Sequence, residues 1–334
     1  MKRNASVVLF LLLSWTAWGQ VETVYMAVLS TTGALYDQED IPRFGLFVST
    51  DRGERWEHRG WRDYIRTFYV EEAREGVLWS ACGNGILRSS DQGRSWKVTT
   101  GWEVTEVLKV HAAEDDPRVV FAATAYGVWR TTDGGESWIR SSSGIEPPFV
   151  TDVCIDRDDW HHVLAATETG VYRTEDGGEH WVPTGRVGEA VRVVVQDLHN
   201  GRQFWAGTEE HGVMVSTDGG RSWAERSGGL ADSTVYAIAL HPAQEGWIYA
   251  GTFAGGVCVS TNGGREWKQS STGLTDLQVH ALVLFPSDPM VLLAGTLNDG
   301  VFRSTDGGAS WSYVAHDSSQ VWGLSVRSSF PMRR

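Results

Sequence analysis

Residues 216–223 read Ser-Thr-Asp-Gly-Gly-Arg-Ser-Trp, and this octapeptide is one copy of a pattern that recurs along the whole chain. The pattern, Ser/Thr-x-Asp-x-Gly-x-x-Trp, occurs seven times if Asn is allowed in place of Asp in the sixth copy, and consecutive tryptophans lie 40 to 44 residues apart. We call it the turn motif. Its third position is occupied by Asp51, Asp91, Asp133, Asp176, Asp218, Asn262 and Asp306, and its last by Trp56, Trp96, Trp138, Trp181, Trp223, Trp267 and Trp311. A steady period of this length indicates a repeat protein.

The remainder of each period also repeats, and it reads as short β-strands. A strand rich in small residues precedes each motif, as in residues 249–256, and an alternating strand such as 235–240 precedes that one. No segment between them has room for a helix of ordinary length. Each period therefore predicts four antiparallel strands, with the motif turning the third strand into the fourth.

A single four-stranded sheet of this size cannot bury both of its faces. Stacking the copies around an axis buries them and leaves only short edges, which is the architecture of a β-propeller. The sequence predicts an all-β fold: one seven-bladed propeller over residues 20–328, followed by a tail at 329–334. Blade 1 lacks its innermost strand, so we expect the C-terminal strand at 321–326 to complete it and close the ring.

The motif has a structural explanation that involves no chemistry. Its glycine permits the positive φ of a tight turn, and its aspartate accepts hydrogen bonds from the N–H groups of that turn. Its tryptophan begins the fourth strand, where a large aromatic side chain fills the wedge between neighbouring blades. We therefore expect the motif to stabilise the fold and not to form the functional site.

The motif resembles the Asp-box, or bacterial neuraminidase, repeat. This repeat occurs in sialidases, xyloglucanase-type glycosidases, sortilin-type receptors and photosystem II assembly-factor-like propellers, and the resemblance implies a structural role for the box. The sialidase arginine stands in an Arg-Ile-Pro context, whereas this chain has Ile41-Pro42-Arg43. Xyloglucanase-type enzymes place their carboxylates between two propellers, and this chain predicts one. The assembly-factor family fits in length and blade count, but its binding face is arginine-rich.

The N-terminus is typical of a signal peptide. Lys2 and Arg3 precede a mostly apolar run at 7–18, and Ala17 and Gly19 are small residues at the positions that signal peptidase reads. We expect residues 1–19 to be removed and the chain to be exported to the periplasm or the extracellular space. The run is too short to cross a bilayer, so no membrane insertion is expected. The three cysteines, Cys82, Cys154 and Cys258, are expected to be buried free thiols.

Charge and composition restrict the partners. The formal net charge of −13 argues against binding to nucleic acid. No cysteine or histidine cluster has the spacing of a zinc site, and the turn motifs lack the acid spacing of calcium loops. We expect no metal and no cofactor, a monomer, and a protein or glycan ligand.

The candidate binding residues lie on one face of the predicted propeller. The connections between blades and the turns from second to third strand emerge together there; we call it the loop face, and the opposite one the motif face. One long connection, at 30–43, and one acid near the start of each blade contribute to it. The candidates are Tyr36, Asp37, Asp40, Arg43, Asp63, Glu103, Asp152, Glu189, Asp232, Asp276 and Asp317. For the long connection a plain surface loop is the alternative, and for each acid turn capping is the favoured one.

Aromatic residues of the loop face have two interpretations as well. Trp61 and Trp102 suit sugar stacking, but they align with Ile145, Leu230 and Leu274, which favours an apolar packing position. Tyr126, Phe253, His211 and His316 occupy matching turns as isolated residues.

Two functions remain in view. We expect an exported binding or scaffold module that uses the loop face, and no catalytic residue is assigned. The alternative is a glycoside hydrolase, which needs two carboxyl groups at a defined separation. Two carboxylates facing each other in a deep groove would favour the enzyme, and a shallow charged face would favour the module.

Overall fold

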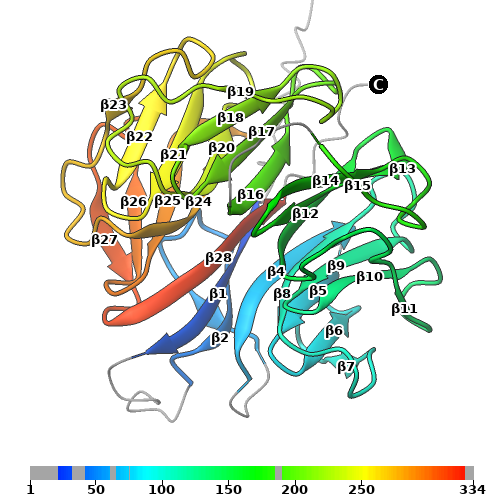
Figure 1. Cartoon of the computed structure of the whole chain (residues 1–334). Coiled ribbons are helices and arrows are strands. Elements are labelled where there is room, and N and C mark those ends of the chain that lie inside the picture. Colours follow the sequence, from blue (N-terminus) through cyan, green and yellow to red (C-terminus); the bar gives the residue numbers. More distant parts are fainter. Residues whose placement is uncertain (1–21, 32–41, 61–64, 75, 185–189, 328–334) are drawn as a thin grey trace, which may run out of the picture.

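A computed structural model describes residues 22–31, 42–60, 65–74, 76–184 and 190–327 (Figure 1). These residues form seven four-stranded antiparallel sheets and no helix. The all-β prediction and the count of seven blades are confirmed. Over the described ranges, no helix has the length and apolar character required to cross a membrane.

Each blade is given from its innermost strand outward. Blade 1 contains β28 (Ser319–Arg327), β1 (Thr23–Thr31), β2 (Gly45–Ser49) and β3 (Glu57–His58). Blade 2 contains β4 (Thr67–Arg74), β5 (Val77–Cys82), β6 (Gly85–Ser89) and β7 (Lys97–Val98). Blade 3 contains β8 (Val107–Ala112), β9 (Val120–Thr124), β10 (Gly127–Thr131) and β11 (Ile139–Arg140).

The remaining four blades follow the same order. Blade 4 contains β12 (Val150–Asp156), β13 (Asp159–Thr167), β14 (Gly170–Thr174) and β15 (Val182–Pro183). Blade 5 contains β16 (Val191–Gln196), β17 (Phe204–Thr208), β18 (Val213–Ser216) and β19 (Ala224–Glu225). Blade 6 contains β20 (Val235–Leu240), β21 (Ile248–Thr252), β22 (Val257–Ser260) and β23 (Lys268–Gln269). Blade 7 contains β24 (Val279–Phe285), β25 (Asp288–Thr296), β26 (Val301–Ser304) and β27 (Ser312–Ala315).

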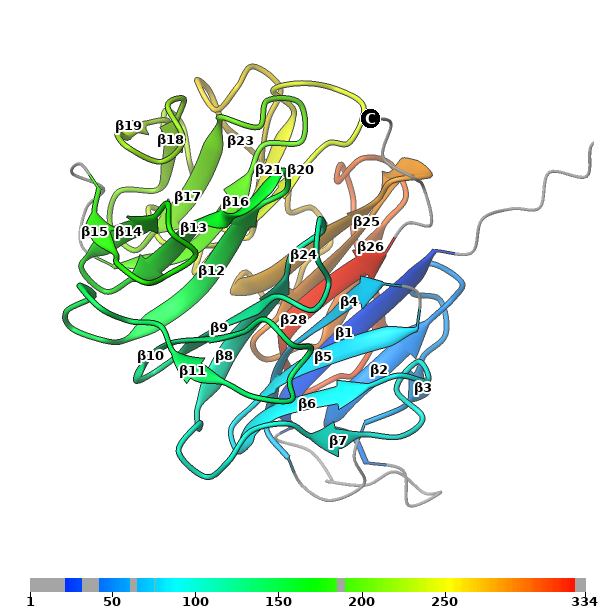
Figure 2. The same cartoon turned by 90° about the vertical axis from the view of Figure 1, so that its right-hand side faces the viewer.

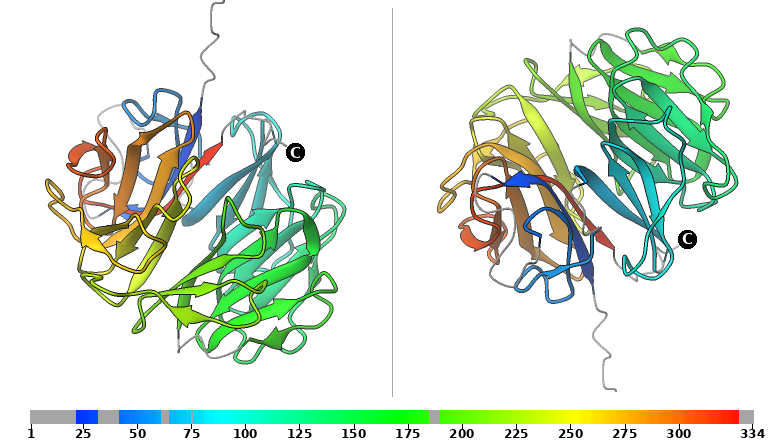
Figure 3. Two further views of the ribbon diagram at one scale, coloured as in Figure 1. Left: turned by 90° about the horizontal axis from the view of Figure 1, so that it is seen from above. Right: turned by 90° about the horizontal axis from the view of Figure 1, so that it is seen from below.

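The C-terminal strand closes the ring, as predicted. β28 pairs with β1 in antiparallel register, for example Leu324 opposite Met26, and the two strands lie side by side in Figure 2. Each innermost strand contacts that of the next blade, and β28 contacts both β24 and β4. Figure 3 shows the sheets from two opposite sides, with the red end of the chain beside its blue beginning. Both chain ends thus contribute to blade 1.

The turn motif forms a compact hydrogen-bonded loop. In blade 5, the Ser216 hydroxyl donates to Asp218 Oδ1 at 2.8 Å and accepts from the Gly220 N–H at 2.9 Å. Asp218 Oδ1 also accepts from the Ser222 N–H at 2.9 Å. Gly220 has φ +79°, the positive value that the pattern predicts. In blade 6, Asn262 Oδ1 accepts the equivalent bonds, so an amide oxygen suffices at the aspartate position.

The motif tryptophans join neighbouring blades. Trp181 of blade 4 is 3% exposed, and its Nε1–H donates to the Ser141 carbonyl of blade 3 at 2.7 Å. Four more tryptophans reach back one blade in the same way: Trp96 to Arg59, Trp223 to Thr184, Trp267 to Arg226 and Trp311 to Ser270. The Nε1 atoms of Trp56 and Trp138 are buried, and no described residue accepts a hydrogen bond from them. The predicted position between blades is confirmed by these bonds.

Glycines in the second strands allow the blades to approach one another. A Cβ atom on Gly207 of β17 would lie 2.7 Å from the Val235 carbonyl oxygen of β20. On Gly295 of β25 it would lie 2.5 Å from Val321 Cγ1 of β28. The innermost strand of the next blade therefore fills the space that a side chain would need.

Candidate functional site

Each innermost strand carries one extra residue near its start, on the loop face. In β20, Val235 pairs with Thr252 and Ala237 with Gly251, which leaves Tyr236 without a partner. The same register shift, a β-bulge, occurs in all seven blades. The bulged residues, which we call the bulge ring, are Phe68, Leu108, Thr151, Arg192, Tyr236, His280 and Trp322.

Four consecutive members of the bulge ring are aromatic and touch across blade boundaries. The Tyr236 and His280 rings stack with centroids 4.0 Å apart and an interplanar angle of 27°. The His280 and Trp322 centroids lie 5.1 Å apart, and those of Trp322 and Phe68 lie 5.6 Å apart. Phe253, from the turn after β21, lies edge-on to Tyr236 at 6.0 Å. We call these five residues the aromatic arc.

The aromatic arc combines buried and exposed rings. Trp322 is 36% exposed and Phe253 is 44% exposed, whereas Phe68 is buried. Burial, with the nearby Arg192 charge, lowers the pKa of His280 to about 4. The imidazole is therefore neutral at physiological pH and contributes an uncharged ring to the stack.

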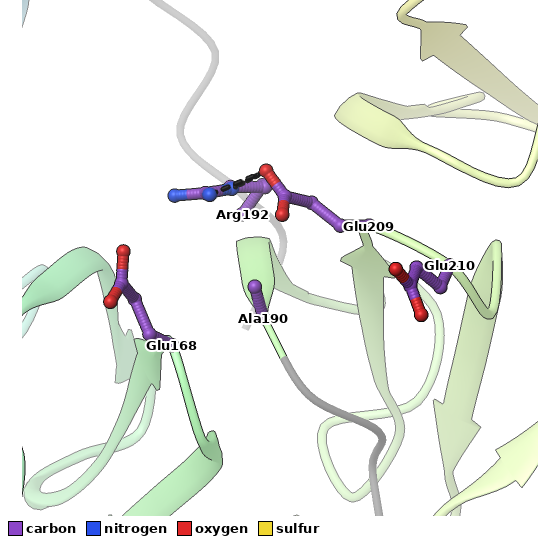
Figure 4. A pocket seen from close by; sticks show the side chains of 5 residues that line it. All are labelled: Glu168, Ala190, Arg192, Glu209 and Glu210. Carbon is purple, nitrogen blue, oxygen red and sulfur yellow. Dashed lines mark hydrogen bonds and ion pairs between the residues drawn. The ribbon is translucent and has the colours of Figure 1, made fainter.

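A cavity of about 240 Å³ opens beside the aromatic arc, between blades 4 and 5. Glu168 from the turn after β13, Glu209 and Glu210 from the turn after β17, Ala190 and Arg192 line it (Figure 4). Arg192 Nε donates to Glu209 Oε1 at 2.7 Å, and a second guanidinium nitrogen contacts the same oxygen. In Figure 4 the guanidinium extends toward the side on which Glu168 stands.

Arg192 links the cavity to the aromatic arc, because it belongs both to the bulge ring and to the cavity wall. Burial, and next the Glu209 charge, raises the pKa of Tyr236, so the arc begins within electrostatic reach of the cavity. Aromatic, cationic and anionic groups thus meet on one face.

A charged cluster built around one buried carboxylate lies one residue beyond the bulge ring. Lys109 Nζ lies 3.8 Å from Asp152 Oδ1 and 3.8 Å from the centre of the Tyr69 ring. Burial alone would lower the pKa of Lys109, but the charges of Asp152 and the other nearby acidic groups together outweigh it and raise that pKa. Asp152 Oδ2 also accepts from the Val194 N–H at 3.1 Å. The cluster ties together the innermost strands of blades 2 to 5.

Asp152 corrects one sequence-based expectation. It was expected in the connection before its blade, but it lies inside β12 and is 3% exposed. The bulge at Thr151 shifts it to the side of the strand that faces Lys109. It is therefore not an exposed acid of the loop face.

Two other predicted acids accept hydrogen bonds that hold the loop-face turns. Asp232 accepts from the N–H groups of Thr234 and Ala254. Asp276 accepts from the Gln278 N–H at 3.0 Å and the Asn298 N–H at 2.8 Å. Each carboxylate therefore joins the connection before its blade to the turn between the second and third strands.

The remaining candidates are dispersed. Arg43 pairs with Asp317, whose side chain is mostly exposed, and Glu103 is exposed. Five candidates lie outside the described residues: Tyr36, Asp37, Asp40, Asp63 and Glu189. Trp61 lies outside them too.

Trp102 corrects a second expectation. The packing interpretation was favoured because Ile145 occupies the same place in the next repeat, and Ile145 is 3% exposed. Trp102, in contrast, is 92% exposed. The repeat alignment was wrong here because the connection before blade 3 holds Val104, not Trp102, in the core.

The bulge ring was not found from the sequence. A signal for it exists: in six blades the ring residue directly follows a valine near the start of the innermost strand, and it varies among Leu, Thr, Arg, Tyr, His and Trp. A variable, mostly aromatic or charged position within a repeated strand is typical of a site placed on a scaffold.

Over the described ranges, no three side chains of His, Cys, Asp or Glu gather as metal ligands would. Cys82, Cys154 and Cys258 are free and buried.

Comparisons with known proteins show the fold. No family model matches the chain, and no curated protein matches it significantly. The GH74 xyloglucanase from Xanthomonas campestris is 21% identical with a TM-score of 0.60, over 74% of this chain but 45% of the enzyme. YCF48 from Cyanidioschyzon merolae is 16% identical with a TM-score of 0.59, over 77% of this chain and 87% of that one.

A structure of YCF48 bound to D1 peptide is similar as well, with 15% identity and a TM-score of 0.58. It matches over 78% of this chain and 92% of that one. At these identities the likeness shows the propeller fold alone. The chain spans less than half the length of the xyloglucanase.

Proposed function

We propose that this propeller is a binding module that holds a polypeptide segment at the bulge ring on the loop face. The observation that carries the proposal is the aromatic arc, in which exposed Trp322 and Phe253 adjoin stacked Tyr236 and His280. Partly exposed aromatic side chains on a rigid scaffold provide large contact area at low entropic cost, which is typical of binding hot spots.

The arc is well suited to binding because four of its five residues come from innermost strands. These strands lie in the interior of the ring and hold their side chains in fixed positions, unlike long surface loops. A peptide is the ligand that we propose, and one propeller of similar fold, YCF48, has a structure with D1 peptide bound. The net charge of −13 supports a ligand other than nucleic acid.

Two further parts of the proposal concern the class of the repeats and the cellular location of the protein. The hydrogen-bonded loops of the turn motif support assignment of the repeats to the Asp-box class. The apolar run at 7–18 supports export through a signal peptide at residues 1–19. Buried, unpaired cysteines are compatible with either redox environment.

A glycoside hydrolase is the second candidate, and the cavity is the observation that favours it. Glu168 and Glu210 are two carboxyl groups on opposite sides of Arg192, and glycosidases use such pairs. The third acid, Glu209, is held by Arg192 and is less available as a catalyst. If the chain hydrolyses xyloglucan oligosaccharides, and Glu168→Gln and Glu210→Gln each abolish release of reducing sugar, the enzyme is correct and the binding module is not its main function.

The test of the binding module is a comparison of two truncations of exposed apolar side chains. Ten-residue peptides selected from a display library on the wild-type chain are titrated against Trp322→Ala and Met290→Ala. Met290, in β25 on the motif face, is 44% exposed and is the matched control. We expect at least a tenfold loss of affinity for Trp322→Ala and less than a twofold change for Met290→Ala. Equal affinity for both variants contradicts the proposal, provided that both melt like the wild type.

A further inference from the structure

The geometry points to a specific ligand chemistry, and this inference rests on the proposed function. We infer that the bound segment carries a basic side chain next to a large apolar one. The basic side chain enters the cavity lined by Glu168, Glu209 and Glu210, and the apolar one packs on Trp322 and Phe253.

The described residues that line the cavity carry more negative charge than Arg192 neutralises. Arg192 is paired with Glu209 through two of its guanidinium nitrogens. Within the described structure, Glu168 and Glu210 form no ion pair, although both line the same cavity. Two carboxylates therefore remain for a cationic group of the ligand. A lysine or arginine side chain has a long apolar stem, which suits a cavity of about 240 Å³.

The aromatic arc supplies the apolar half of the recognition. His280 is neutral, so its ring extends the uncharged surface between Tyr236 and Trp322. Trp322 and Phe253 expose about a third or more of their surface beside it. Indole faces also attract guanidinium and ammonium groups, which favours a cation over an anion on both halves of the site.

Charge complementarity excludes the opposite ligand. An acidic segment would place its carboxylate against Glu168 and Glu210, and it would meet the field of a chain with net charge −13. Among the described residues that line the cavity, Arg192 is the one cation, and it already has an anionic partner. A basic segment gains from all of these features.

The inference is tested with three synthetic peptides, N-acetylated and C-terminally amidated. The first has the sequence Gly-Trp-Gly-Arg-Gly, the second replaces Arg by Glu, and the third replaces Trp by Ala. Affinity is measured by isothermal titration calorimetry at about 50 mM and at about 500 mM salt. The Arg peptide is expected to bind at least tenfold more tightly than the Glu peptide, and high salt should reduce that difference because it screens exposed charges.

Protein variants separate the cavity from the arc. The double variant Glu168→Gln/Glu210→Gln keeps the size of both side chains. It should lower the affinity for the Arg peptide about tenfold and change the affinity for the Glu peptide little. The control, Glu266→Gln, removes one exposed charge on the motif face and should leave the affinity unchanged.

Failure of the inference and failure of the proposed function give different results. If Trp322→Ala lowers the affinity for all three peptides alike, and the Arg and Glu peptides bind equally well, the site binds peptides but the inferred preference for a basic side chain is wrong. If the double variant binds the Arg peptide as the wild type does, the cavity is not the basic subsite. If no peptide binds in a way that depends on Trp322, both proposals fail.

Discussion

Replacement of Trp181 by alanine tests the wedge between blades. The indole is 3% exposed and packs in a cluster that includes Phe121 of blade 3 and Val163 of blade 4. Its Nε1–H donates to the Ser141 carbonyl at 2.7 Å, in the preceding blade. The substitution therefore removes both packing and a hydrogen bond at one boundary of the ring.

The expected loss is large for a single residue. Deletion of a buried aromatic side chain costs about 3–5 kcal/mol of unfolding free energy. Leaving a buried carbonyl without its donor contributes about 1 kcal/mol within that range. Trp181→Phe retains a large aromatic ring but not the Nε1–H donor, so we expect a loss of about 1–2 kcal/mol.

The assay is equilibrium unfolding in urea, followed by far-ultraviolet circular dichroism. The control is Trp102→Ala, because Trp102 is 92% exposed and its loss should change the unfolding free energy by less than about 0.5 kcal/mol. If Trp181→Ala costs no more than Trp102→Ala, the motif tryptophan does not hold the blades together. If Trp181→Phe lowers the unfolding free energy as much as Trp181→Ala does, the hydrogen bond and not the packing is decisive.

Three further predictions follow from the closure, the turns and the motif. Deletion of residues 319–334 removes β28 and exposes the edge of β1, so we expect a lower and broader thermal transition; an unchanged, sharp transition contradicts ring closure. Asp276→Ala removes the acceptor for the Gln278 and Asn298 N–H groups and should lower the free energy of unfolding in urea by about 1–2 kcal/mol. Asp276→Asn keeps an acceptor oxygen and should lower it less, so equal losses of unfolding free energy in the two variants would mean that capping is unimportant. Hydrogen bonds from Ser95 and Ser89 lower the pKa of Asp91 to about 2, below the unfolded value of about 3.9. The stabilisation that the ionised carboxylate contributes is therefore present above about pH 4 and is lost as the pH falls toward 2. In an acid titration followed by circular dichroism, the loss of folded protein should depend less steeply on pH for Asp91→Asn than for the wild type, and identical titration curves would contradict this role of Asp91.

The propeller was predictable because its determinants are local or lie one period apart. The turn at Asp218 is completed within eight residues, and Trp223 bonds to Thr184 in the preceding repeat. A count of such motifs therefore counts blades. The closing strand at β28 was predictable for a similar reason, because blade 1 lacked one strand and the C-terminus supplied one that aligned with β20.

The site was less predictable, because a bulge is a property of a strand pair and not of one strand. Tyr236 and His280 read as ordinary positions of alternating strands until the pairing with β21 and β25 shows the extra residue. The same bulge in β12 moves Asp152 from an expected exposed acid to a buried partner of Lys109. The sequence shows which acids precede a strand, whereas contacts between blades decide which side chains gather.

The central claim is that ligand binds the loop face at the bulge ring, and amide hydrogen exchange measured by mass spectrometry tests it directly. The probe is the tightest peptide selected on the wild-type chain, compared with the free protein. We predict slower exchange in the loop-face turns at residues 209–212 and 253–256, with no change in the turn motifs at 216–223 and 260–267. Protection confined to the motif turns, with the loop-face turns unchanged, would contradict the account.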